Sequence, residues 1–67
     1  MDKPLTTDEN VDIVSIIQET EYGFDDPCSG SIVDYDNDKV YLIFDFNDKA
    51  IDSEHVTVDR KTMKVEE

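Results

Sequence analysis

The most constraining feature of this sequence is an apolar alternation on both sides of the short polar segment Asn37-Asp38. Residues 29–36 and 39–46 have the pattern of two strands, and the second, KVYLIFDF, is the most apolar run in the chain. Asn and Asp tolerate the positive φ angles that a two-residue hairpin turn demands. We therefore predict an antiparallel hairpin with Asn37-Asp38 at its tip.

This turn also predicts the register of the hairpin. Tyr35 then lies opposite Val40, and the strands pair in step from there down to Ser31. Because side chains alternate between the two faces of a strand, the register separates an apolar face from a mixed one, which we expect another strand or loop to cover in part. The apolar face holds Val33, Tyr35, Val40, Leu42, Phe44 and Phe46, and the mixed face holds Ile32, Asp34, Tyr41, Ile43 and Asp45.

The segment before the hairpin decides between two folds. Five of the seven residues at positions 11–17 are Val or Ile, whose branched side chains favour strands. On a helix they would spread over more than half of the circumference, which is broader than the stripe that a surface helix buries. Thr6 and Glu9, in contrast, have the spacing of a helix capping box. We predict a strand over residues 11–18, with a helix over residues 8–20 as the alternative.

Turn signals divide the rest of the chain into short strands. Residues 47–49 form a turn, and the tail predicts a second hairpin with Arg60-Lys61 at its tip, or a longer loop with a shifted register. The predicted fold is all-β, a five-stranded antiparallel barrel or sandwich that is SH3-like in outline. If residues 8–20 are helical, the fold is instead α+β, with this helix on a four-stranded antiparallel sheet.

Composition and charge limit the class of protein. The chain has 18 acidic and 6 basic side chains, a net charge of −12, and this field repels nucleic acids and anionic membranes but attracts basic proteins. One cysteine, no apolar run of about 20 residues and no signal-peptide pattern predict a cytoplasmic protein. We expect one small acidic domain over residues 1–67, with residues 1–9 flexible.

Candidate chemical sites are few. Asp34, Asp36 and Asp38 have the first, third and fifth positions of an EF-hand calcium loop, but Lys39 stands where that loop requires glycine. One histidine and one cysteine are too few for a zinc site, and they would form a catalytic pair only if the fold joined them. We expect no enzymatic activity, no bound metal and no cofactor, and weak binding of a divalent cation at the hairpin tip stays open.

Two functions of different class fit this sequence. The first is a non-enzymatic acidic protein that occupies a basic surface of a partner, such as a nucleic-acid-binding protein or nuclease. In composition the chain resembles small phage or mobile-element proteins that mimic DNA, and immunity proteins against basic nucleases, which implies an inhibitor or decoy with an anti-defence or immunity role. The alternative is a generic small β adaptor or structural interaction module whose charge only provides solubility. The predicted contact residues are Asp25, Asp26, Asp34, Asp36, Asp38, Asp45 and Asp48, with Tyr22, Phe24 and Tyr41 as apolar anchors.

Overall fold

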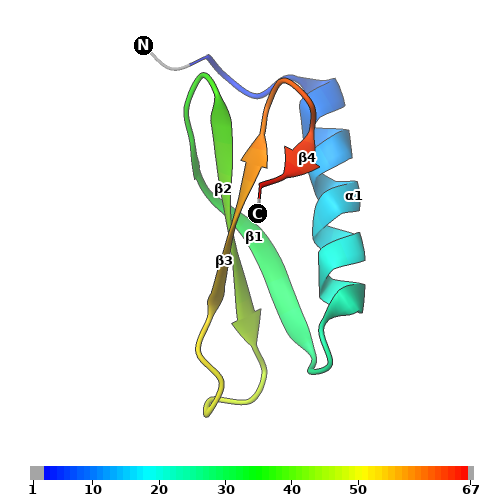
Figure 1. The fold of residues 1–67 in the computed structure, drawn as a ribbon, viewed down its shortest axis with the longest axis vertical. Coiled ribbons are helices and arrows are strands. Elements are labelled where there is room, and N and C mark those ends of the chain that lie inside the picture. Colours follow the sequence, from blue (N-terminus) through cyan, green and yellow to red (C-terminus); the bar gives the residue numbers. More distant parts are fainter. Residues whose placement is uncertain (1–2, 67) are drawn as a thin grey trace.

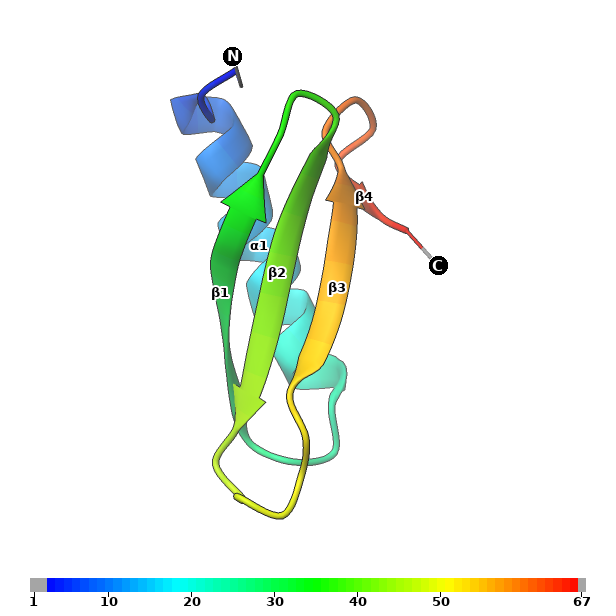
Figure 2. The same ribbon diagram turned by 90° about the vertical axis from the view of Figure 1, so that its left-hand side faces the viewer.

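The computed structural model describes residues 3–66 as one helix and one four-stranded antiparallel sheet (Figure 1). The strands lie in the sheet in the order in which they occur along the chain. The helix crosses one face of the sheet, and the described residues leave the other face open (Figure 2). The elements are α1 (Thr7–Gly23), β1 (Cys28–Tyr35), β2 (Lys39–Phe46), β3 (Glu54–Asp59) and β4 (Lys64–Val65).

The prediction of an all-β fold with five strands is wrong. Residues 11–18 lie within α1, and the sheet is open rather than closed into a barrel. The architecture is α+β, a helix on a four-stranded antiparallel sheet, which the sequence had left as the alternative. No helix among the described residues is long and apolar enough to cross a membrane.

The capping box at the start of α1 is one reason why this segment is helical. Thr6 Oγ1 accepts a hydrogen bond from the Glu9 backbone N–H at 3.1 Å, and Glu9 Oε1 accepts one from the Thr6 backbone N–H at 3.1 Å. Two backbone donors that a helix start leaves without partners are satisfied in this way. The sequence predicts a flexible segment over residues 1–9, whereas residues 7–9 form the first helical turn. Met1 and Asp2 lie outside the described residues.

Only part of the broad apolar surface of α1 is buried against the sheet. Ile13 is fully buried and Ile16 and Ile17 pack beside it, so these three residues supply the side of the helix that faces the sheet. Val11 and Val14 remain 60% and 51% exposed. The apolar residues cover more of the helix than the sheet buries. The strand propensity of Val and Ile, taken alone, therefore predicted a strand where the chain forms a helix.

The core lies between α1 and the sheet, and β2 is its centre. β2 is flanked by β1 and β3, and it supplies three of the five fully buried side chains, as expected for the most apolar run. Phe24 closes the core beyond the end of α1, with its ring centroid 5.5 Å from that of Phe44 and 5.2 Å from that of Phe46. The fully buried residues are Ile13, Val40, Leu42, Phe44 and Val58.

The tip of the β1–β2 hairpin is confirmed, but its register changes further down. The Asp36 backbone N–H donates to the Lys39 carbonyl at 2.9 Å, which closes the two-residue turn. A bulge at Val33 then shifts the pairing by one residue, so that Ile32 lies opposite Leu42. The predicted faces are therefore wrong for Val33 and the residues of β1 before it: Ile32 turns to the helix side, and Val33 is left 58% exposed.

The β3–β4 connection is the longer of the two loops that the sequence allowed. Val58 pairs with Val65, and residues 60–63 form the loop instead of a tip at Arg60-Lys61. The Met63 backbone N–H donates to the Asp59 carbonyl at 2.8 Å, and Met63 has a φ angle of 54°. The longer loop turns the Arg60 side chain into the protein, where it is buried.

The bulge has a packing consequence that can be tested at Gly30. It places Gly30 opposite Phe44, and a Cβ at this position would lie 2.5 Å from Phe44 Cε1 and 2.7 Å from Ile17 Cγ2. We expect Gly30→Ala to lower the free energy of unfolding by about 1–3 kcal/mol, because an overpacked core must shift to accept the methyl group. Urea unfolding followed by circular dichroism measures this difference.

Gly23→Ala is the matched control. A Cβ at Gly23 has nothing within 4 Å, and this residue is the last of α1, where alanine favours the helix. The control is expected to leave stability unchanged or slightly raised. Equal destabilisation by both substitutions would contradict the close contact at Gly30.

Candidate functional site

The charged residues divide between the two ends of an elongated molecule of 37 × 21 × 20 Å. The hairpin end holds the start of α1, the β1–β2 turn and the β3–β4 loop (Figure 1). The loop end holds the α1–β1 loop and the β2–β3 loop (Figure 1), which are joined where the Asn47 backbone N–H donates to the Pro27 carbonyl at 3.0 Å. The predicted contact residues fall into both groups.

At the hairpin end, the carboxylate of Asp36 accepts hydrogen bonds from groups of the β1–β2 turn and from Tyr41. Its Oδ1 accepts hydrogen bonds from the backbone N–H groups of Asp38 at 2.9 Å and Lys39 at 2.8 Å, and its Oδ2 accepts one from Tyr41 Oη at 2.9 Å. The backbone bond from Asp38, followed by the Tyr41 bond, lowers the pKa of Asp36, and the same carboxylate raises the pKa of Tyr41. Two predicted contact residues, Asp36 and Tyr41, therefore shape the turn.

The aspartates of the hairpin tip accept hydrogen bonds within the hairpin. Asp34 Oδ1 accepts a hydrogen bond from the Tyr35 backbone N–H at 2.8 Å, and the Asp36 oxygens are occupied as described. Among residues 3–66, no three His, Cys, Asp or Glu side chains are grouped so that they could hold a metal ion. The turn is held by hydrogen bonds within the chain.

Most of the positive charge also lies at the hairpin end. Lys39 Nζ lies 3.8 Å from the Asp59 carboxylate and contacts the Glu66 carboxylate, and Arg60 pairs with Glu9. All ion pairs of the described residues are at this end, so its carboxylates are partly neutralised. Its five cations are Lys3, Lys39, Arg60, Lys61 and Lys64.

The loop end carries the unneutralised charge. It holds eight carboxylates and a single cation, Lys49. Asp45 Oδ1 accepts a hydrogen bond from Ser53 Oγ at 2.7 Å and Asp48 Oδ1 accepts one from the Ala50 backbone N–H at 2.9 Å, while Asp25 and Asp26 are exposed. The eight residues are Glu19, Glu21, Asp25, Asp26, Asp45, Asp48, Asp52 and Glu54.

The structure therefore brings together four of the seven predicted aspartates, Asp25, Asp26, Asp45 and Asp48, and places the other three at the opposite end. Tyr22 belongs with the four: it lies in the last turn of α1 and is 93% exposed. Phe24, which was predicted as an apolar anchor, packs instead on the rings of Phe44 and Phe46 at the edge of the core. Glu19, Glu21, Asp52 and Glu54 were not among the predicted contact residues. The fold brings them to the same end, because α1 and β2 both end there and β3 begins there.

Cys28 and His55 are not brought together. Cys28 lies at the start of β1 opposite Phe46, on the helix side, and His55 of β3 lies opposite Ile43 on the open face, with β2 between the two strands. Burial, and then the negative charge of Glu21, raises the pKa of the Cys28 thiol. The structure offers no cysteine–histidine pair for catalysis among the described residues.

No protein family, curated protein or solved structure matches this chain. Its function is inferred from its own charge and surface.

The most buried charged pair is Arg60 with Glu9, which are 3% and 16% exposed in their side chains. Arg60 Nε donates to Glu9 Oε2 at 2.9 Å and Arg60 Nη2 donates to Glu9 Oε1 at 2.8 Å. The Arg60 side chain, followed by the Thr6 backbone N–H, lowers the pKa of Glu9 to about 2. This arginine is enclosed by protein groups, so it serves the fold rather than an external anion.

The Glu9 pKa gives a prediction with a defined pH range. We expect Glu9→Gln to lower the free energy of unfolding by about 2–3 kcal/mol at neutral pH, because Arg60 stays buried without its counter-ion. The folded pKa of about 2 lies below the ordinary value of 4.5, so the Glu9 contribution is complete above that value and is lost as the pH falls from 4.5 to 2. Urea unfolding of both proteins across this range measures the difference.

The difference between the two proteins is the informative quantity, because protonation of the other carboxylates relieves repulsion in both. It should shrink towards zero as the pH approaches 2. Glu19→Gln, at an exposed position of the same helix, is the control and should show a small difference at every pH. A Glu9→Gln difference that is constant with pH would contradict the assignment.

Proposed function

We propose that this chain is a non-enzymatic acidic binding protein whose loop end occupies a basic surface of a partner protein. The observation that supports this proposal is the separation of charge, with eight carboxylates and Lys49 at the loop end and the ion pairs at the hairpin end. A surplus of one charge at one end gives a directional field, and such a field steers a basic partner to that end.

The loop end is also held in shape. Phe24 packs on two core rings, the α1–β1 and β2–β3 loops are joined by a backbone hydrogen bond, and Glu21 Oε2 accepts one from the Gly30 backbone N–H at 2.5 Å. Preorganised charges lose less conformational entropy on binding than charges on free loops. Tyr22 adds an exposed ring beside the carboxylates, and tyrosine is among the residues that contribute most to protein interfaces.

The partner that fits this end is a protein with a basic groove for nucleic acid, for example a nuclease. The carboxylates would take the place of phosphates, and the chain would act in the cytoplasm as an inhibitor or decoy. The compositional resemblance to DNA mimics and to immunity proteins supports an anti-defence or immunity role of phage or mobile-element origin. In the alternative, a generic adaptor, the charge would serve solubility and the partner would not depend on it.

Charge reversal at one end at a time tests this proposal. We expect Asp25→Lys, Asp26→Lys and Asp48→Lys together to weaken capture of the partner about tenfold or more, because the complementary charge is lost. The measurement is affinity capture from the source cell lysate at low and then high salt, with identification of the eluted protein and a titration of the purified partner.

The matched control reverses three carboxylates of the hairpin end that lie outside α1 and β1, Asp38, Asp59 and Glu66. It has the same net charge as the loop-end variant. If the partner responded only to the net charge of the protein, both variants would therefore weaken its capture equally. The control is expected to retain the partner. Capture that is insensitive to salt and to both variants would favour the adaptor.

A further inference from the structure

The outer edge of β1 exposes backbone hydrogen-bonding groups. β1 is the first strand of the sheet and pairs only with β2. In an antiparallel pair, successive residues direct their N–H and C=O groups alternately towards the neighbour and away from it. The Gly30 N–H donates to the Glu21 side chain rather than to β2, so Gly30 is an outward position, and Ile32, two residues further, is the next. The N–H and C=O groups of Ile32 therefore face the free edge.

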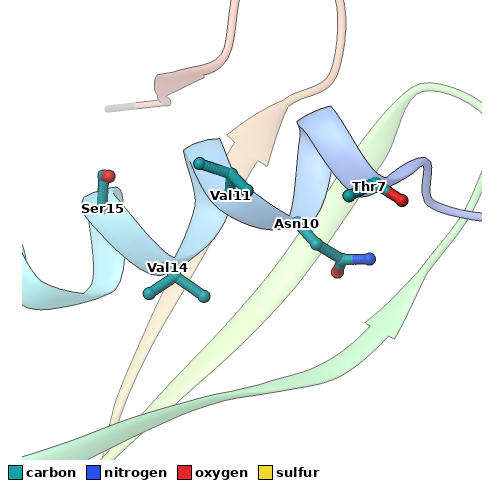
Figure 3. A pocket seen from close by; sticks show the side chains of 5 residues that line it. All are labelled: Thr7, Asn10, Val11, Val14 and Ser15. Atoms are coloured by element: carbon teal, nitrogen blue, oxygen red, sulfur yellow. The ribbon is translucent and has the colours of Figure 1, made fainter.

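Glu21 also identifies the side of α1 that flanks this edge. Residues three or four apart lie on the same side of a helix, so the stripe that ends at Glu21 contains Gln18, Val14, Val11 and Thr7. Val11 and Val14 are exposed, and a shallow depression of about 360 Å³ lies along this stripe. Val14 points from α1 towards the side of β1 (Figure 3). The residues that line the depression are Thr7, Asn10, Val11, Val14 and Ser15.

Together these features form a slot with two apolar walls. One wall is Val14 of α1, which points towards β1 (Figure 3), and the other is Ile32 of β1, which is 37% exposed. Because Ile32 pairs with Leu42, its side chain is on the same side of the sheet as α1. A short strand placed along Ile32 would direct alternate side chains towards Val14 and away from it.

The charge around the slot indicates its occupant. Residues 4–38, which contain α1, β1 and the β1–β2 turn, include ten carboxylates and no Lys, Arg or His. Asp8 and Asp12 lie on α1, Asp34 follows the exposed part of β1, and Glu21 stands at the other end of the slot. These carboxylates attract an occupant with positive charge and repel an acidic one.

We propose that this slot binds an extended segment of a basic protein, with apolar residues alternating with Lys or Arg, that pairs with β1 as an additional strand. The proposal rests on the proposed function, since it names the form of basic partner that the chain takes. Backbone hydrogen bonds to Ile32 supply the pairing, Val14 and Ile32 receive the apolar side chains, and the carboxylates receive the cations. Binding of this kind selects the partner segment by its alternation of apolar and basic residues as well as by its charge.

A second copy of the chain is a poorer occupant. Two β1 edges would bring ten carboxylates of each copy together, in a protein with a net charge of −12. The bulge at Val33 and the Glu21 carboxylate on Gly30 also interrupt the edge, as natural proteins do to prevent pairing between copies. A short segment of another protein needs only the part of the edge around Ile32.

The experiment uses a defined probe, an end-blocked octapeptide in which Lys and Val alternate, added to the full chain labelled with ¹⁵N. We expect amide shifts at Ile32 and Val33 and along residues 11–18, and slower hydrogen exchange at the Ile32 amide. The control probe carries the same side chains but has N-methyl groups on alternate backbone nitrogens, in both registers. It should bind about tenfold more weakly, since it keeps the charge and loses the strand hydrogen bonds.

One pair of variants separates the slot from the rest of the surface. Val14→Asn should weaken binding of the alternating peptide about fivefold, whereas Val65→Asn, at the exposed β4 edge, should leave it unchanged. Equal binding of the N-methylated peptide, shifts confined to the loop end, or no binding would overturn the slot. The proposed function would survive the first two results, because it depends on the loop-end charge. Sedimentation of the free protein as a dimer that Val14→Asn disrupts would assign the slot to a second copy and would also overturn the proposal.

Discussion

The ion pair between Glu9 and Arg60 joins parts of the chain that are far apart in sequence. Arg60 makes two hydrogen bonds to Glu9, and its remaining N–H groups donate to the carbonyl oxygens of Lys3, Pro4 and Asp36 at 2.7–3.2 Å. A guanidinium has five N–H donors, and five hydrogen bonds meet them here, so the loss of water around a buried charge is offset. The helix start, the β1–β2 turn and the β3–β4 loop are thereby held against one another, and a lysine could not make the same set of contacts.

This use of the only arginine has a consequence at the other end of the molecule. With the cations gathered at the hairpin end, the carboxylates of the loop end repel one another, and a small domain has little stability to offset repulsion. The loop end is held instead by neutral contacts, the Phe24 packing and the Asn47–Pro27 backbone bond. An arrangement that concentrates repulsion at one place is unfavourable in the free protein and would be relieved if a cationic surface covered it, which is the physical basis for the proposed binding role.

The sequence predicted the parts of the fold that depend on neighbouring residues. The Asn37-Asp38 turn and the central place of β2 followed from alternation and turn chemistry, and the capping box was visible although Val and Ile outweighed it. The bulge at Val33 was not predictable, because it depends on fitting Gly30 against Phe44. The candidate site was split for a simple geometric reason: a strand rises about 3.3 Å per residue, so the eight residues of β2 place Asp38 and Asp48 at opposite ends. Strand length alone would have predicted that separation.

Glu21 connects the two proposed binding surfaces. Its carboxylate is one of the eight at the loop end, and by accepting the Gly30 N–H it also closes the lower end of the slot beside β1. The loop end and the slot are therefore neighbouring parts of one acidic side, formed by α1, β1 and the loop between them, where residues 4–38 carry no basic side chain. A single partner with a basic surface and an adjoining extended segment could cover both, the surface contributing fast, salt-sensitive association and the segment contributing selectivity through backbone pairing. Charge alone would bring many proteins to this side, and the short exposed part of β1 would retain those whose chain can add a strand.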